Sequence, residues 1–593
     1  MKSAALLAAL ASAVAAASIA RSDASCLTVS GDAAWPAKSE WQKAMPEIET
    51  QKPKESWTQP PYRLDATTVA EVIAAINFTR QHNIRLSILN SGHDFVGRND
   101  APTGLTLSVS GLKGARLLSS FTPAKDGVPS VDSKTALNTL PTQKGQAYLT
   151  FGAGYNTREL NSLLAPSNLL TLGAAHGSVS VAGGWGQTAG HAPLSAKYGL
   201  GVDQVVEYKV VTADGVLKVA NEATNPDLFW ALRGGGGGTF GVVVEATIKA
   251  HPSQKVAMTQ IWINTTDYND QSSIYPFAAK FMSEFTAWQD KGMGAYYWLY
   301  PNAMSIFAFY SNDDASKDWM NEQFKPTMTK ISKMKGINSK TMVFVPLEFP
   351  NFWAFFKQVW GDMPGKGGEG MPGGMTARMT ASPAPPTLSR RHGPGDGAAT
   401  AARGIVYLDS WLLGKKELQS DKWASVLKAA MPNLPGGNLG GQFIGGGETI
   451  KLGNNDPTSV LPAWRQTYLH LILYAYGKPS SLPLRQFAPD MGAYANEAYP
   501  RTHQNWQTTY WGKHYPKLAE VKKKYDPTSL FWVTPGIGAE AWTAQPDGRL
   551  CRSERSSTNA TAAFAPLNDN KNDADPHVID EIAGSAFPIK YSG

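Results

Sequence analysis

Four glycine-rich segments in the first half of the chain are the residues best suited to hold a ligand. Glycine adopts positive φ angles and lets backbone N–H groups approach a ligand closely, as a pyrophosphate group requires. The segments are residues 90–98 (NSGHDFVGR), 151–154 (FGAG), 182–190 (AGGWGQTAG) and 229–241 (FWALRGGGGGTFG). We therefore expect these loops to bind a phosphate-bearing ligand.

The same loops disfavour the two commonest nucleotide-binding motifs. Gly152-Ala-Gly154 has no third glycine and follows no suitable N-terminal βαβ unit, so a nicotinamide enzyme is disfavoured. No glycine-rich loop runs into Lys-Ser or Lys-Thr, as a P-loop would. Metal catalysis is not expected either, because the ten histidines form no ligand-spaced cluster such as His-Glu-x-x-His.

Hydrophobic spacing predicts the elements that present these loops. Thr68 and Glu71 can form a capping box, and apolar residues then recur at helical spacing. Residues 84–88 alternate between apolar and polar, which predicts a strand leading directly into 90–98. Further along, the pattern predicts a strand–loop–helix over 148–164, a hairpin around Asp214-Gly215 and a strand over 240–248.

Length and composition predict two domains. The chain has 593 residues, well beyond the ~250–300 at which a single core stops growing. Hydrophobic residues are 42% and charged residues 17%, which is typical of a globular chain with a large core. The composition changes near residue 257, beyond which aromatic residues become more frequent. We expect a ligand-binding domain at 55–252, an α+β domain at 253–492 with a disordered insertion at 361–403, a C-terminal segment at 493–551 and a tail at 552–593.

The N-terminus predicts export from the cell. A short basic start and an Ala-rich apolar run at 1–20 are typical of a cleavable signal peptide, the alternatives being a membrane anchor or a poorly ordered tail. In an oxidising compartment the only two cysteines, Cys26 and Cys551, are expected to form a disulfide. Sequons occur at Asn77, Asn264 and Asn559.

Membrane and nucleic-acid partners are not expected. No later segment offers the ~20 consecutive apolar residues of a membrane-spanning helix. The net charge of +7 is scattered along the chain, and no recognition motif accompanies it. The expected partner is a small molecule, and nothing in the sequence indicates an oligomeric state.

Taken in order, the four loops, the continuation of the third at 198–203 (YGLGVD), and the C-terminal residues 492–497 (GAYANE) and 525–527 (YDP) resemble one family. They are similar to the vanillyl-alcohol-oxidase flavoproteins, whose FAD-binding domain is of the p-cresol-methylhydroxylase type. Within that family the closest resemblance is to the berberine-bridge-enzyme-like branch. The resemblance covers most of the mature chain. It implies an α+β, two-domain flavoprotein, with an antiparallel sheet covered by helices as the substrate domain and a C-terminal segment that returns to the FAD domain.

The resemblance implies that His93 is bonded covalently to the 8α-methyl group of FAD. Many members of this branch add a cysteinyl bond, which this chain cannot form because no cysteine lies between Cys26 and Cys551. We therefore expect a single covalent attachment.

The resemblance also implies that Ala182 is too small to block oxygen, which favours an oxidase over a dehydrogenase. The other residues expected at the cofactor are Asn90, Ser91, Gly92, Asp94, Gly97, Arg98, Gly152, Gly154, Gly183, Gly184, Gln187, Gly190, Asp203, Gly238, Gly241, Val242, Val243 and Asn496.

The candidate catalytic residues are Tyr494, His470 and His191. An alcohol or amine oxidase needs a base for the proton on the heteroatom, and a tyrosinate or histidine suits that role if its pKa lies near the operating pH. The branch places a tyrosine in a Tyr-x-Asn motif, which Tyr494-Ala-Asn496 matches. Many relatives carry a second tyrosine just beyond this motif, where the present chain has Glu497. The identity of the base therefore stays open.

The predicted function is oxidation of a small alcohol, hydroxy compound or sugar-like substrate, with O2 reduced to hydrogen peroxide. Oxidative C–C or C–N bond formation in secondary metabolism, by a cyclase or dehydrogenase, is the alternative within the same branch. An alternative of another class is a flavin-loaded binding protein without catalytic activity. The protein is expected to act outside the cell.

Overall fold

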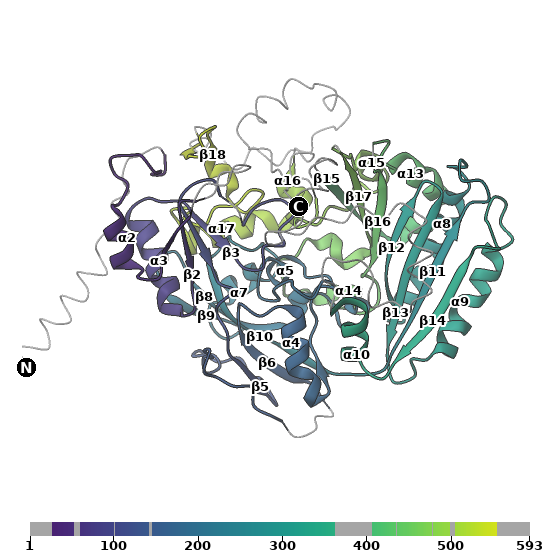
Figure 1. The fold of residues 1–593 in the computed structure, drawn as a ribbon, viewed down its shortest axis with the longest axis horizontal. Helices are drawn as coiled ribbons and strands as arrows, with labels where there is room; N and C mark the ends of the chain where they lie inside the picture. The colour runs from purple at the N-terminus through teal and green to yellow at the C-terminus, as the bar shows by residue number, and fades with distance from the viewer. Residues whose placement is uncertain are drawn as a thin grey trace, which may run out of the picture.

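Two lobes make up the molecule, and the segments at its two ends lie together in one of them (Figure 1). The computed structural model describes residues 26–51, 60–99, 101–140, 145–361, 406–434, 436–476, 478–498 and 505–553. The predicted signal peptide, nearly all of the predicted insertion and tail, and the sequon at Asn559 lie outside these residues. None of the described helices is both long enough and apolar enough to cross a membrane.

A small sheet begins the first lobe. Its strands are β1 (Glu49–Thr50), β2 (Tyr62–Asp65), β4 (Leu105–Ser108) and β3 (Leu86–Leu89), in that spatial order. Helix α3 (Val69–Gln81) connects β2 to β3, and both strands run parallel to β4. The predicted capping box is confirmed, because Thr68 accepts from the backbone of Glu71 and the Glu71 carboxylate accepts from the backbone of Thr68.

A larger antiparallel sheet completes this lobe. Strand β10 (Val242–Pro252) lies at its centre, buried along most of its length. The other strands are β5 (Ala115–Leu118), β6 (Ala147–Gly152), β7 (Leu169–Leu170), β8 (Val205–Val211) and β9 (Leu217–Ala220). Its helices are α4 (Thr157–Leu164), α5 (Gly184–Thr188), α6 (Ser195–Tyr198) and α7 (Pro226–Leu232), while α2 (Lys38–Ala44) precedes the small sheet. The predicted hairpin is confirmed by the pairing of β8 with β9 and the positive φ of Gly215.

The second lobe is built on one seven-stranded antiparallel sheet, drawn in teal and green in Figure 1. Its order is β14 (Val343–Phe349), β11 (Val256–Asn264), β13 (Ala303–Ser311), β12 (Gly294–Tyr300), β16 (Asn438–Phe443), β17 (Thr467–Tyr476) and β15 (Val406–Gly414). Helix α8 (Ile274–Gln289) packs on β12 and β13, and α9 (Lys317–Ile331) packs on β11 and β14. The shorter helices are α10 (Phe352–Phe356), α12 (Lys415–Leu418), α13 (Trp423–Ala430), α14 (Gly447–Lys451) and α15 (Leu482–Phe487).

The C-terminal segment leaves this sheet and packs back on the first lobe. It contains α16 (Trp506–Trp511) and α17 (Tyr515–Tyr525). The indole N–H of Trp511 donates to the carbonyl of Gly234 over 3.1 Å, and Lys522 Nζ donates to the carbonyl of Thr239 over 2.6 Å. Both carbonyls belong to the fourth glycine-rich segment (residues 229–241), which we call the five-glycine loop. The C-terminal segment therefore holds this loop by hydrogen bonds.

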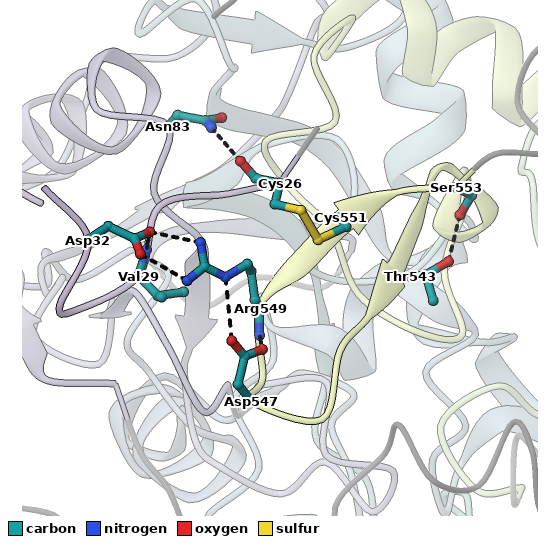
Figure 2. Close-up of a disulfide and its surroundings, with 9 residues drawn as sticks. All are labelled: Cys26, Val29, Asp32, Asn83, Thr543, Asp547, Arg549, Cys551 and Ser553. Atoms are coloured by element: carbon teal, nitrogen blue, oxygen red, sulfur yellow. Dashed lines mark hydrogen bonds and ion pairs between the residues drawn. A yellow bond between two sulfur atoms is a disulfide. The ribbon is translucent and has the colours of Figure 1, made fainter. Parts of the chain in front are cut away.

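A disulfide joins the two ends of the described chain (Figure 2). Cys26 is bonded to Cys551, as the sequence predicts, and the bond spans 525 residues. Cys551 lies on β19 (Leu550–Arg552), which pairs with β18 (Trp542–Ala544). The guanidinium of Arg549 donates to both carboxylate oxygens of Asp32 over 2.9 Å beside the disulfide.

Two of the predicted glycosylation sites, Asn77 and Asn264, lie among the described residues. Asn77 lies within α3, and a Cβ atom placed on Gly215 of the β8–β9 hairpin would lie 2.2 Å from its Oδ1. The sequon's Thr79 is fully buried and donates its hydroxyl to the carbonyl of Ala75. Asn77 therefore lies close to the β8–β9 hairpin, and its glycosylation stays a prediction. Asn264 lies at the end of β11, two residues before the exposed Thr266, and its glycosylation likewise stays a prediction.

Candidate active site

The predicted glycine-rich loops converge in the first lobe. The Asn90 side-chain amide donates to the carbonyl of Ala153 over 2.9 Å, which joins the first loop to the second. The carbonyl of Gln187 accepts from the backbone N–H groups of Gly234 and Gly236, which joins the third loop to the fourth. A Cβ atom placed on Gly237 would lie only 2.8 Å from the Cα of Gly184. Four segments that are far apart in the sequence therefore form one continuous backbone surface.

The first loop is held in shape by an internal ion pair. Gly92 and Gly97 have φ angles of 75° and 78°, the left-handed region that favours glycine. Asp94 pairs with Arg98, with 2.5 Å between Oδ1 and Nη2. Arg98 also donates to Oδ1 of Asn496 over 2.7 Å. The loop is thereby tied to the C-terminal segment.

His93 lies on this loop in a partly exposed position. Its Nε2 is 2.6 Å from the hydroxyl oxygen of Ser178, and that oxygen is 2.9 Å from Nδ1 of His176. The two imidazole rings lie 4.9 Å apart between centroids. Because Ser178 can donate to one ring and accept from the other, it can hold a neutral, nucleophilic form of His93.

The loop surface fits the FAD that the family resemblance implies. Oδ1 of Asn90 is buried without a hydrogen-bond partner in the described chain, and it lies where the first and third loops meet. Gly184 has open space where its Cβ would stand. Gly238 has a φ of 73° and only one side-chain atom, of Val533, within 4 Å of a Cβ atom placed there. An unpaired acceptor and uncovered glycine backbone are the features that a cofactor with phosphates and amides would use.

Several predicted cofactor residues have packing roles that are visible in the structure. A Cβ atom at Gly154 would lie 2.3 Å from the carbonyl oxygen of Ser110, so this glycine is required by the neighbouring backbone. The same holds for Gly152, Gly190 and Gly241, which face the backbone of Leu112, Gly201 and Val211. Val242 and Val243 begin β10 and are buried, Ala182 and Gly183 lead into α5, and Ser91 is exposed.

Asp203 links the lobes through an ion pair. Both of its carboxylate oxygens accept from the guanidinium of Arg465, over 2.8 and 2.9 Å. Arg465 also pairs with Asp456 over 2.8 Å. The side chain of Gln187 donates to the carbonyl of Ala182 and is likewise engaged within its own loop. The structure therefore gives Asp203 and the Gln187 side chain structural partners.

The three predicted catalytic residues come together in a buried cluster. The ring centroids of His191 and His470 lie 5.4 and 5.7 Å from that of Tyr494, and 5.8 Å from each other. Trp464 packs against all three rings. His191 follows α5, His470 lies on β17, and Tyr494 belongs to the C-terminal segment. The cluster therefore forms where the lobes meet.

Glu497 lies between the two histidines. Its Oε1 is 3.1 Å from Nε2 of His191, and its Oε2 is 3.6 Å from Nδ1 of His470. The side-chain amide of Gln442, on β16, donates to the same carboxylate over 3.4 Å. Burial disfavours ionisation of Glu497, but the two histidines and Gln442 outweigh it and hold the carboxyl pKa below its usual value. These neighbours therefore favour the carboxylate form of Glu497, although the side chain lies in the protein interior.

Burial moves the titration of Tyr494 and His470 away from neutral pH. It raises the pKa of the Tyr494 hydroxyl well above its ordinary value, and the charge of Glu497 adds to this shift. It lowers the pKa of His470 to about 3. The expectation of a catalytic tyrosinate is therefore unfavourable at Tyr494. Its hydroxyl instead accepts from Nδ2 of Asn496 over 2.7 Å.

Two features of this cluster escaped the sequence analysis. Ligand spacing along the chain did not reveal that donor atoms of His191, His470 and Glu497 lie within 4.8 Å of one another, a set that could hold a metal ion. Gln442 belongs to no recognisable sequence motif, so its place beside Glu497 was not predicted. The one available signal was Glu497 itself, because it replaces a tyrosine of the family pattern.

Comparison with known proteins supports the family resemblance drawn from the sequence. A family model for an FAD-binding domain matches residues 60–221, and a model described as berberine and berberine-like matches residues 493–538. An FAD-linked oxidoreductase of Arthroderma benhamiae is 31% identical over 522 residues, covering 83% of this chain and 79% of the relative.

Two solved structures share the fold. A VAO-type flavoprotein of Myceliophthora thermophila C1 has a TM-score of 0.70 at 23% identity, covering 89% of this chain and all of the other. A glucooligosaccharide oxidase of Acremonium strictum, described as carrying 6-S-cysteinyl, 8α-N1-histidyl FAD, has a TM-score of 0.60 at 16% identity, covering 83% and 98%. Together with the converging loops and the returning C-terminal segment, these likenesses show that the chain belongs to the FAD-linked oxidoreductases of the vanillyl-alcohol-oxidase type, in the branch with a berberine-like C-terminal segment.

Proposed function

We propose that the protein is a secreted FAD-dependent oxidase that carries its cofactor through one covalent bond, at His93. It oxidises an alcohol, hydroxy or sugar-like substrate and reduces O2 to hydrogen peroxide. The observation that carries the proposal is the placement of His93. It lies on the loop surface suited to FAD, with Nε2 held 2.6 Å from the hydroxyl of Ser178.

The residues around His93 support a single attachment. The glucooligosaccharide oxidase is described as holding FAD through both a cysteine and a histidine. This chain has a histidine on the corresponding kind of loop, but its two cysteines are consumed by the Cys26–Cys551 disulfide. The hydroxyl of Ser178 beside His93 is a hydrogen-bonding group and is not a thiolate nucleophile.

The residues of the chain divide the work of the reaction between the two lobes. Bound FAD would accept a hydride from the substrate carbon and return the electrons to O2. The first lobe supplies the surface that holds the cofactor, and Asn496 connects it to the buried cluster, donating to the carbonyl of Gly184 over 3.2 Å. The cluster around Glu497 provides the groups that can accept the substrate's hydroxyl proton in a site from which bulk water is excluded.

An oxidase is preferred over the other two functions on specific grounds. Ala182, directly before Gly183, is small and buried, so it presents no bulk that would keep oxygen from the cofactor. An ionised, buried carboxylate between two histidines costs free energy to maintain, which argues against a binding protein with a decayed site. Carbohydrate oxidases among the structural neighbours support a polyhydroxylated substrate.

The test is peroxide release by the purified protein. It should be assayed in air against a panel of primary and secondary alcohols, mono- and oligosaccharides, with peroxide measured by a coupled peroxidase. We expect stoichiometric peroxide for the substrates that bleach the flavin absorbance anaerobically. Bleaching by a substrate without peroxide in air would show a dehydrogenase or cyclase, and no bleaching by any substrate would favour a binding protein.

A further inference from the structure

We infer that Glu497 is a positioning residue that makes His191 the proton acceptor of the reaction. In this arrangement the Glu497 carboxylate holds the Nε2–H of His191, and the lone pair on Nδ1 receives the hydroxyl proton of the substrate. The inference rests on the proposed function and names the group that performs its proton transfer.

The hydrogen-bond chemistry of the cluster determines the tautomer of His191. An ionised carboxylate only accepts hydrogen bonds, so the nitrogen that faces it carries a hydrogen. Nε2 of His191 is 3.1 Å from Oε1 of Glu497, which places the hydrogen on Nε2. A neutral imidazole then has its lone pair on Nδ1. A buried carboxylate orients the histidine of serine-protease triads in the same way.

Nδ1 of His191 is free to act. It is buried and has no hydrogen-bond partner among the described residues. An unpaired buried nitrogen costs free energy, so its persistence needs a reason, and an incoming hydroxyl group supplies one. His191 follows Gly190, the last residue of the third cofactor loop, so this nitrogen belongs to the chain segment that leaves the cofactor surface.

His470 is less suited to the same role. Its Nδ1 faces Oε1 of Gln442 over 3.3 Å and lies 3.6 Å from Glu497, so the carboxylate holds it less closely. Its ring is fully buried, and burial lowers its pKa to about 3. A nitrogen with that pKa is a poor acceptor near neutral pH. We assign His470 to the support of Glu497.

The groups that face His191 are neutral apart from Glu497. Tyr494 and Trp464 contact its ring, and both are uncharged at neutral pH. Arg98 reaches the cluster through Asn496, whose Oδ1 it binds. The hydroxyls of Tyr296 and Tyr474 are influenced by the charge of Glu497, and burial keeps both protonated. Among the described residues, Glu497 is thus the acidic group that faces His191.

The step is balanced as follows. The substrate O–H bond breaks and its proton goes to Nδ1 of His191. The C–H bond on the carbon that carries this oxygen breaks, and its hydrogen leaves with both electrons as a hydride, which bound FAD would accept. The C–O bond becomes a carbonyl. The imidazolium then gives up this proton, which together with the hydride accounts for the two hydrogens of the hydrogen peroxide formed from O2.

A metal centre on the same three residues is the competing account. A histidine that binds a metal usually donates its second ring N–H to a carboxylate or carbonyl. Here Nδ1 of His191 and Nε2 of His470 both lack such a partner in the described chain. The outer contacts of a metal site are missing, which favours the hydrogen-bonded arrangement.

The direct test is NMR of the flavin-loaded protein labelled with 15N-histidine. Long-range 1H–15N correlations distinguish the two tautomers, and His191→Gln assigns the signal. We expect His191 as the Nε2–H tautomer in the wild type and loss of that preference in Glu497→Gln. A wild-type His191 protonated on Nδ1 would overturn the inference. This readout needs no substrate, so it stands even if the peroxide assay fails.

The rate of flavin reduction in variants provides a second test. With the substrate that releases most peroxide in the panel, flavin reduction should slow by about 10²–10⁴-fold in both Glu497→Gln and His191→Gln. The double variant should be no worse than either single one, because the two residues act as a unit. Glu497→Asp should recover part of the rate. The matched control, Glu540→Gln, removes a carboxylate that binds Tyr515 elsewhere and should leave the rate unchanged.

Two further outcomes decide against the inference. Flavin reduction at the wild-type rate in His191→Gln, with His470→Gln inactive, would move the base to His470. One equivalent of zinc or iron in the purified protein, measured by mass spectrometry and lost in Glu497→Gln, would establish the metal centre.

Discussion

Buried ionisable side chains decide the chemistry at the scale of single residues. Tyr494, His470 and Glu497 all lie in the same interior, yet burial favours the neutral forms of the first two, while the neighbouring histidines and Gln442 lower the pKa of the third. The family pattern makes Tyr494 the natural candidate for the base. The structure instead gives its hydroxyl a partner in Asn496 and shifts its pKa in the wrong direction for a proton acceptor.

Tyr494→Phe should therefore be a mild variant. Removing the hydroxyl takes one acceptor from Asn496, whose amide still donates to the carbonyl of Gly184. We expect kcat to fall less than about tenfold, with the pH dependence of flavin reduction unchanged, since general-base loss costs more than this. A fall beyond a hundredfold, accompanied by loss of a limb of the pH profile, would make Tyr494 the base after all.

At the scale of elements, local signals were readable from the sequence and long-range ones were not. The helix start at Thr68 and Glu71 and the hairpin at Gly215 depend on neighbouring residues only, and both predictions are confirmed. The order of the seven-stranded sheet depends on pairings such as β12 with β16, whose residues are more than a hundred positions apart. The long separation of His191 from His470 and Glu497 likewise hid the meeting of these three residues, which only the folded sheet and the returning C-terminal segment bring about.

Arg465 connects elements of the two lobes, and its loss should be costly. It lies between Asp203 and Asp456, and its side chain is only 7% exposed. Arg465→Met would leave two largely buried carboxylates without a cation, a change that costs about 3–5 kcal/mol in other proteins. Urea denaturation at pH 7 should show this loss, while the flavin spectrum of the folded variant stays that of the wild type. A change below about 1 kcal/mol would contradict the linking role.

The same network predicts how stability responds to acid. Although burial opposes it, the Arg465 guanidinium lowers the pKa of the Asp456 carboxyl in the folded protein. A lowered folded pKa contributes stability above the ordinary value of about 4 and loses it as the pH falls through the folded value. Asp456→Asn should therefore be destabilised at pH 7 and show a flatter loss of stability between pH 5 and pH 3. An unchanged slope would contradict the assignment, with denaturation midpoints as the measurement.

At the scale of the whole molecule, both ends of the described chain secure the cofactor lobe. The Cys26–Cys551 disulfide and the Arg549–Asp32 ion pair fasten the ends to each other, and Trp511 and Lys522 hold the five-glycine loop (Figures 1 and 2). The two-lobe organisation was predictable from length and motifs. The closeness of the ends was predictable only because the chain has no third cysteine.

The double variant Cys26→Ser, Cys551→Ser tests this closure. A disulfide that closes so long a loop restricts the unfolded chain, and its removal typically costs about 2–4 kcal/mol. We expect a lower melting temperature, with peroxide release at 25 °C retained, because the disulfide joins β19 to the N-terminal segment and is not part of the glycine-rich loops. Loss of bound flavin in the folded double variant would show that the closure shapes the site itself.

The covalent bond at His93 is the claim on which the account depends. Intact-mass measurement of the acid-denatured wild type should show the chain plus one FAD, and a digest should place the flavin on the peptide containing His93. His93→Ala should fold, bind FAD reversibly and release it on denaturation. A denatured wild type at the mass of the bare chain, or a His93→Ala protein that still carries attached flavin, would contradict the account.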